Sequence, residues 1–258
     1  MQNLGIFKAD KLIATLNYVG LPLAALYVTC MFIIPLVQSA GDWAYLQGVW
    51  DRWQSLNVGM LAFISSIIAF NISRFNAEKQ RERDFLASKA FLPEALSELT
   101  TYCRESALLL NEGWGVQPGS SPTLKVPELP KEYKSIFGEC IRHAEPEVGD
   151  YLSQILVWLQ VHDSRIRSYA KQYHSTGQFQ SQKSLLITYF FKLGELQAMV
   201  NKLFDFARNM AEFDSRPLKW KDFHTAYANL DIWEEKIRIS DNLNLETHTK
   251  KALSGDES

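Results

Sequence analysis

The stretch LIATLNYVGLPLAALYVTCMFIIPLV, Leu12 to Val37, decides the fold of this chain. Between Lys11 and Asp42 the only ionisable side chains belong to tyrosine and cysteine. The run exceeds the roughly 20 residues that a helix needs to cross a hydrocarbon core of ~30 Å. A signal peptide is the competing interpretation, but its apolar core has about 7 to 15 residues and precedes a small-residue cleavage site. Residues 12–37 are therefore predicted to form a transmembrane helix, preceded by an N-terminal tail, residues 1–11.

Two prolines lie in this first span, Pro22 inside it and Pro35 near its end. Proline has no amide N–H, so a carbonyl one turn earlier in the helix loses its usual donor. Inside a membrane that carbonyl must be satisfied by a neighbouring helix or by water.

A second uncharged run, QSLNVGMLAFISSIIAFNIS, spans Gln54 to Ser73 and is just long enough to cross a bilayer. It is less apolar than the first run because serine and asparagine interrupt it. Small residues recur along it at spacings of three and four, which places them on one face of a helix. The candidate seam comprises Gly59, Ala62, Ser66, Ala69 and Ser73. Gly20 and Ala24 form a shorter pair in the first span.

Small residues on one stripe let helix backbones approach closely in lipid, where hydrophobicity does not drive association. One interpretation is that these residues pack the two spans against each other as a hairpin. The other is that the stripe forms the seam of a homo-oligomer.

The distribution of basic residues predicts the orientation of the two spans. The only basic residue of the short connector, residues 38–53, is Arg52. By contrast, four basic residues follow the second span: Arg74, Lys79, Arg81 and Arg83. The positive-inside rule then places both termini in the cytoplasm and the connector outside, in a plasma membrane of the bacterial inner-membrane type. Trp43, Tyr45, Trp50 and Trp53 in the connector are typical of an interfacial aromatic belt. Acids alternate with the four bases, so this segment marks a membrane boundary rather than a grip on lipid or nucleic acid.

Residues 74–239 show the periodicity of helices and not that of strands. Three apolar seams repeat at alternating spacings of three and four, which is typical of antiparallel bundles. The seams are Leu92, Leu96, Leu99, Cys103, Ala107 and Leu110; then Leu152, Ile155, Leu159, His162, Ile166, Tyr169 and Tyr173; then Leu186, Tyr189, Leu193, Leu196, Val200, Leu203, Ala207 and Met210.

Boundaries within this part follow from proline, glycine and charge. Helix is expected to continue from the second span to Pro93, which kinks it or begins a new helix. Residues 111–130 are predicted to be a loop, residues 220–239 a last helix, and residues 240–258 a flexible tail. The predicted fold is an all-α membrane protein, a two-helix transmembrane hairpin followed by a cytoplasmic bundle of about five helices.

The composition excludes some partners and identifies few sites. The formal net charge of the 258 residues is −2, which does not favour direct binding to nucleic acid. The three cysteines form no CxxC pair, as is usual for free thiols in a reducing compartment. No phosphate-binding glycine loop, nucleophile elbow or HExxH motif occurs, so we expect no enzymatic activity, no cofactor and no small-molecule substrate.

Several polar groupings were weighed as sites. Cys140 and His143 lie one turn apart, but a structural zinc site needs four ligands. The carboxylates of the long helix are expected on a solvated face; they are Glu195, Asp205, Glu212 and Asp214. His162 falls on an apolar seam and is the candidate pH-sensitive core residue.

In plan, two spans followed by a cytoplasmic helical unit resemble the two-span effectors of bacterial phage-defence systems. That resemblance implies a protein that a cytoplasmic partner holds inactive and that disrupts the membrane as an oligomer once released. The alternative is a non-catalytic accessory or scaffold subunit of a larger membrane complex. A membrane-anchored hydrolase or nuclease is a third hypothesis, for which no catalytic set emerges.

Overall fold

The computed structural model describes residues 18–20, 22–115, 125–176, 183–240 and 242–255. The predicted tail, residues 1–11, and the start of the predicted first span lie outside the described residues. The chain divides into two compact units, Met1–Asn76 and Ala77–Ser258. We call them the hairpin unit and the bundle unit. The described residues are mostly helical, which confirms the predicted all-α class.

Two helices are long and apolar enough to cross a membrane: Tyr18–Ser39 in the hairpin unit, and α4 (Gln54–Lys89), which begins in the hairpin unit and ends in the bundle unit. The first includes a π-helical turn, η1 (Thr29–Ile33), followed by α2 (Ile34–Ser39). The chain reverses at Ala40 and Gly41, both at positive φ. The connector forms helix α3 (Trp43–Arg52), whose first turn is capped by the Asp42 carboxylate accepting from the amide of Ala44 at 2.9 Å.

The π turn lies where Pro35 withholds an amide. In an α-helix the amide of Pro35 would donate to the carbonyl of Met31, and proline cannot supply it. One face of this helix is at least partly buried. Along it the residues are spaced by four and three before η1 and by four after η1, as the wider π turn requires. They are Gly20, Ala24, Tyr27, Met31, Pro35 and Ser39.

Helix α4 runs without interruption from Gln54 to Lys89, so the expected continuation of the second span is confirmed. Its sequence holds no proline or internal glycine after Gly59, and the next proline, Pro93, lies in the first turn of α5 (Leu92–Gly115). Proline is tolerated there because the first amides of a helix have no partner within it. The prediction that Pro93 begins a new helix is thus correct.

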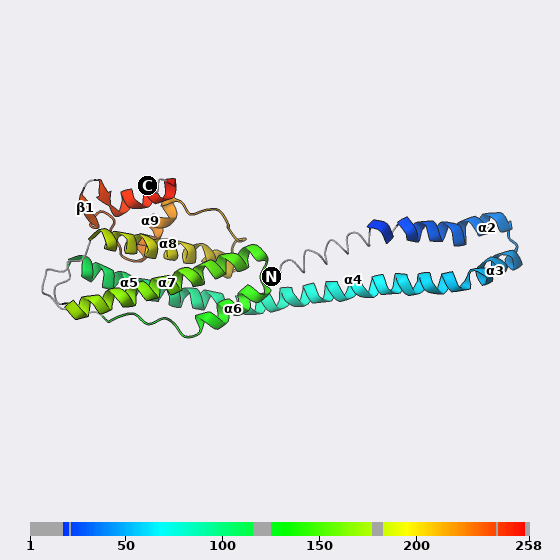
Figure 1. The fold of residues 1–258 in the computed structure, drawn as a ribbon, viewed down its shortest axis with the longest axis horizontal. Helices are drawn as coiled ribbons and strands as arrows, with labels where there is room; N and C mark the ends of the chain where they lie inside the picture. Colours follow the sequence, from blue (N-terminus) through cyan, green and yellow to red (C-terminus); the bar gives the residue numbers. More distant parts are fainter. Residues whose placement is uncertain (1–17, 21, 116–124, 177–182, 241, 256–258) are drawn as a thin grey trace. The chain divides into compact units, whose positions relative to one another are not determined.

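The bundle unit packs α5 and α8 (Lys183–Ala207) against each other, with α7 (Pro146–Thr176) beside α8 and α6 (Tyr133–His143) against α7 (Figure 1). The predicted seams supply its core. All six residues of the α5 seam are fully buried, as are Leu152, Ile155 and Leu159 of α7. Tyr173, the last residue of the α7 seam, lies outside the described side chains. Met210 is 73% exposed because α8 ends at Ala207, so the predicted seam was too long at this end.

Two other boundaries were predicted wrongly. Helix α5 continues to Gly115, so the described part of the 111–130 loop begins later than expected. The expected helix over 220–239 ends early, since α9 covers Trp220–Asn229 and the backbone turns at Asp231, where φ is positive. Two short antiparallel strands then follow, β1 (Arg238–Ser240) and β2 (Leu243–Asn244).

The predicted flexible tail is instead a docked helix, α10 (Leu245–Ser254). The Asn244 side chain caps it by accepting from the amide of Thr247 at 2.8 Å. Leu245 is fully buried, and the Thr249 hydroxyl lies 2.7 Å from that of Tyr227 in the core. A mostly polar segment is therefore ordered by one cap and two buried side chains.

Gly194 of α8 makes the close packing of α9 possible. A Cβ at this position would lie 2.3 Å from the Tyr227 ring. We expect Gly194→Ala to destabilise the bundle unit by about 1 to 3 kcal/mol, because either the ring or α9 must shift. The check is thermal unfolding followed by circular dichroism. Gly138→Ala is the matched control, since a Cβ there meets nothing within 4 Å and should stabilise α6 by up to ~1 kcal/mol. Equal melting temperatures for the two variants would contradict the packing argument.

Candidate functional site

The connector end of the hairpin unit holds a chain of three hydrogen bonds between its helices. The Tyr27 hydroxyl donates to Asn57 Oδ1 at 2.7 Å, and Asn57 Nδ2 donates to the carbonyl of Trp50 at 3.4 Å. Trp50 Nε1 then donates to the carbonyl of Met31 at 3.0 Å. These contacts join the first span, α3 and α4.

Trp50 supplies the donor that Pro35 withholds. The carbonyl that accepts from its indole is the one opposite the missing amide of Pro35. A carbonyl that is kept from water without a donor costs about 1 to 3 kcal/mol, so the indole N–H offsets a penalty at this position. The Trp50 ring also packs against Phe32 and Trp43, with centroid distances of 5.7 and 5.9 Å.

The other connector aromatics are exposed. Trp43, Tyr45 and Trp53 leave 60%, 44% and 49% of their surface uncovered. Amphipathic rings in such positions are typical of a membrane interface. Trp50 differs from the predicted belt in that its polar end is used inside the protein.

The predicted seam of α4 lies on the side opposite the first span. The residues of α4 that are partly buried by the first span and connector are Asn57, Met60, Ile64 and Ile67. At about 100° per residue, their average direction is roughly opposite to that of the small residues. All five seam residues are exposed: Gly59, Ala62, Ser66, Ala69 and Ser73. The stripe therefore does not pack the hairpin, and that interpretation was wrong for α4.

The small pair of the first span has the packing role. Gly20 and Ala24 are both partly buried, and a Cβ on Gly20 would stand 3.8 Å from Ile67 Cδ1 of α4. The two small residues thus lie where the spans approach each other. On α4, by contrast, a Cβ on Gly59 meets nothing within 4 Å.

Of the four boundary bases on α4, Arg74, Lys79 and Arg83 are exposed and Arg81 is half-buried. Lys79 pairs with Glu82 at 2.7 Å, and Arg81 pairs with Glu78 at 2.7 Å and with Glu145 at 2.6 Å. Arg74 and Arg83 are likewise exposed. This arrangement agrees with a solvated helix face whose charges are largely compensated.

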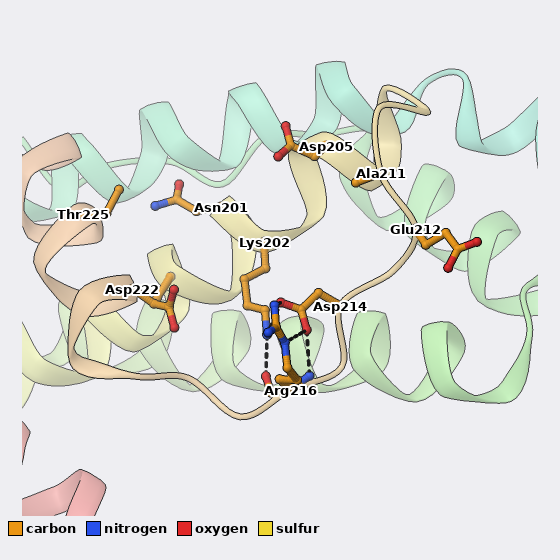
Figure 2. A pocket seen from close by; sticks show the side chains of 10 residues that line it. Asn201, Lys202, Asp205, Ala211, Glu212, Asp214, Arg216, Asp222 and Thr225 are labelled. Atoms are coloured by element: carbon orange, nitrogen blue, oxygen red, sulfur yellow. Dashed lines mark hydrogen bonds and ion pairs between the residues drawn. The ribbon is translucent and has the colours of Figure 1, made fainter.

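A cleft of about 440 Å³ lies between α8, the segment after it and the start of α9. Figure 2 shows Lys202, Asp214 and Arg216 together in it. Arg216 donates to both Asp214 carboxylate oxygens, at 2.8 and 3.0 Å, and holds the pKa of that carboxyl well below its usual range. Lys202 Nζ donates to the carbonyl of Arg216 and lies 3.6 Å from Asp214. The Arg216 guanidinium is thus paired with the Asp214 carboxylate, and the Lys202 ammonium contacts the Arg216 carbonyl and the same carboxylate.

The remaining acids of the cleft do not converge on a point. In Figure 2 the carboxylates of Asp205, Glu212 and Asp222 point in separate directions. Among the residues that the structure describes, no three histidine, cysteine or acidic side chains are placed to hold a metal ion. Cys140 is fully buried, while His143 lies 3.7 Å from Glu139 at the surface, so these two residues form no common site.

His162 is buried between α7 and α5, where only 5% of its surface is exposed. Its ring stands edge-on to Tyr102 at 5.9 Å, and its Nε2 atom has no hydrogen-bond partner among the residues that the structure describes. Burial lowers the pKa of His162 to about 4, opposed by neighbouring Asp163 and assisted by Arg165. The residue is therefore a neutral core histidine near neutral pH, and it titrates well below the range of a cytoplasmic pH sensor.

Sequence reasoning missed the two residues that the structure makes most distinctive, Trp50 and Lys89. The sequence places Trp50 in the predicted aromatic belt. Its role as a hydrogen-bond donor was indicated only by Pro35, which leaves the Met31 carbonyl without its helical donor. Lys89 is 7% exposed and is buried against Phe206, although nothing in its sequence neighbourhood indicates burial.

Replacing Trp50 by phenylalanine removes the indole donor and keeps an aromatic ring beside Phe32 and Trp43. We expect Trp50→Phe to cost about 1 kcal/mol of hairpin stability, because the Met31 carbonyl loses this donor. Unfolding of the detergent-solubilised protein by sodium dodecyl sulfate measures it. Trp43→Phe makes the same change of ring without affecting that carbonyl and should cost less. Equal losses in the two variants would show that ring packing alone matters.

His162 predicts an acid-sensitive bundle unit. Its pKa is lower in the folded protein than its ordinary 6.5, so the unfolded chain binds more protons between pH 6.5 and 4. Stability is complete above that window and falls by about 3 kcal/mol as pH drops through it. His162→Gln should reduce the slope of unfolding free energy against pH by about 1.4 kcal/mol per pH unit. An unchanged slope in His162→Gln would contradict the burial argument.

Comparison of the chain with protein-family models, with curated proteins and with solved structures finds no match in any of the three. The proposals below therefore draw on the chemistry of the chain and on the resemblance in plan stated above.

Proposed function

We propose that the chain is a two-span inner-membrane protein with both termini in the cytoplasm, acting as a non-enzymatic effector. Its hairpin unit assembles with further copies in the membrane, and its bundle unit binds a cytoplasmic protein that controls it. The observation that carries the proposal is the exposed small-residue face of α4. The alternative is an accessory or scaffold subunit of a larger membrane complex.

Membrane insertion is supported by how little of the two long helices is buried. The apolar window of Tyr18–Ser39 is 12% buried within the protein, and that of Gln54–Lys89 is 0% buried. A core helix of a soluble protein with the same composition would be mostly covered by its neighbours. Two uncovered apolar helices joined by a short aromatic connector suit hydrocarbon as their solvent.

Assembly is supported by the difference between two faces of α4. One face meets the first span, while Gly59, Ala62 and Ser66 on the opposite face are exposed, and a Cβ on Gly59 would meet no atom of the described residues within 4 Å. The Ser66 hydroxyl donates to the carbonyl of Ala62 at 2.8 Å, so its polarity is partly satisfied within the helix. A second helix could therefore approach this face closely without meeting a bulky side chain.

Control by a cytoplasmic partner is supported by the continuity of α4. The same helix that forms the second candidate span ends at Lys89 in the bundle unit. A partner that shifts the end of this helix can thereby influence the hairpin without a separate linker. The accessory-subunit alternative uses the same features for docking alone.

The effector proposal predicts that induction of the protein depolarises cells, measured with a potential-sensitive dye. The double variant Gly59→Leu/Ser66→Leu should remove both the depolarisation and the crosslinked oligomer, because leucine blocks close helix approach. The control Ile68→Leu/Ile72→Leu changes exposed residues on another face of α4 and should behave like the native protein.

Several outcomes would contradict the effector proposal. Unchanged polarisation together with stoichiometric co-purification of a transporter or enzyme would favour the accessory subunit. Oligomers that persist in the leucine double variant would exclude the stripe as the seam.

A further inference from the structure

Lys89 is the only buried residue of α4, all of whose residues the structure describes. It stands in the last turn of the helix, and only 7% of its surface is exposed. A helix that is held by a permanent contact normally presents leucine or isoleucine to its partner, as α5, α7 and α8 do. At this position the chain presents an ammonium group instead.

The ammonium of Lys89 lies on an aromatic face. Its Nζ is 3.7 Å from the centre of the Phe206 ring of α8 and 6.0 Å from that of Phe85. Those two rings are themselves 6.3 Å apart. Among the residues that the structure describes, no carboxylate pairs with this ammonium.

Two opposing terms act on this contact. Removing an ammonium from water is costly and lowers the pKa of Lys89, whereas the Phe206 ring attracts the cation. A hydrocarbon side chain would carry no desolvation cost, and a fully paired charge would be held by a stronger attraction. In neither case would cost and attraction oppose each other so closely. A contact of this kind holds the helix end and still releases it at small cost.

The surroundings of Lys89 do not provide a second strong attachment. On the α6 side, a cavity of about 390 Å³ separates the last turns of α4 from Ile136 and Glu139. The ion pair between Arg81 and Glu145 is exposed and therefore contributes little. Phe85 is partly buried against the core, where its ring lies 6.3 Å from that of Phe206. The hold of the bundle unit on residues 81–89 thus depends mainly on Lys89 and Phe85, which both lie against Phe206.

We propose that Lys89 is a release point, a reversible contact through which the bundle unit holds the last turns of α4 and lets them go. In the released state the ammonium returns to water and the Phe206 ring loses its cation, while the α5, α7 and α8 core stays folded. The use of this release in signalling rests on the proposed function. The contact and its reversibility do not.

Hydrogen–deuterium exchange of the full-length protein in detergent tests the release point. In the native protein, amides of residues 84–91 should exchange faster than those of the core of α8. Lys89→Met keeps a long unbranched side chain over Phe206 and removes the cost of burying charge. It should slow exchange of residues 84–91 by about tenfold and leave α8 unchanged. Lys79→Met, at an exposed position of the same helix, should change neither.

Lys89→Ala completes the series. It removes the stem as well as the charge, so exchange of residues 84–91 should increase while α8 stays protected. Faster exchange of that segment in Lys89→Met, or loss of α8 protection in it, would overturn the proposal, because Lys89 would then be a fixed part of the fold. The same holds if residues 84–91 already exchange with the core of α8.

The exchange result is independent of the effector proposal. Native protein that fails to depolarise cells contradicts the effector and leaves the exchange rates as they are. An unchanged rate in Lys89→Met contradicts the release point and leaves the effector proposal standing.

Discussion

A backbone carbonyl that loses its helical donor needs another one, and in the hairpin unit a side chain of the connector supplies it. Pro35 removes an amide from the first span, which has a π turn before Pro35, and the Trp50 indole donates to the Met31 carbonyl at 3.0 Å. Because Trp50 belongs to α3, this bond ties the connector helix to the first span. The Trp50 carbonyl in turn accepts from Asn57 of α4, so the three helices are joined through one residue.

The same helix, α4, has two different kinds of surface because its neighbours differ. Toward the first span it presents the partly buried residues Asn57, Met60, Ile64 and Ile67, of which Asn57 bonds to Tyr27 and Ile67 lies beside Gly20. On the other side the small residues leave a smooth backbone surface. In lipid the apolar side chains gain little from covering one another, so a smooth surface is useful mainly where another helix approaches it. At its far end α4 relies on a buried lysine rather than on an apolar seam.

The bundle core could be predicted from sequence, because its seams depend on helical periodicity alone. Leu96, Leu159 and Leu193 lie in the core as their spacing indicates, and Pro93 begins a helix as proline geometry requires. Helix α10 could not be predicted from its own sequence, since its order comes from a contact with Tyr227, which lies on another helix. Met210 illustrates a further limit, because periodicity does not show where a helix ends.

The candidate sites were predictable only in part. The spacing of the small residues on α4 identified one face correctly, but not whether the first span covers it, because a stripe has the same pattern in either case. His162 was correctly placed in the core by its seam, and burial then removes it from the physiological pH range. The roles of Trp50 and Lys89 could not be predicted, because they depend on atoms of other helices.

Accessibility of single cysteines in oriented membrane vesicles tests the central claim, that two spans place the connector and the bundle unit on opposite sides of a membrane. Cys30 is exposed and is replaced by serine, whereas Cys103 and Cys140 are buried, with the pKa of each thiol raised by that burial. In right-side-out vesicles a membrane-impermeant maleimide should label Gly48→Cys in the connector and spare Lys79→Cys, and in inverted vesicles the pattern should reverse. Labelling of both positions in the same vesicles, or release of the protein from the vesicles by carbonate, would contradict the two-span account.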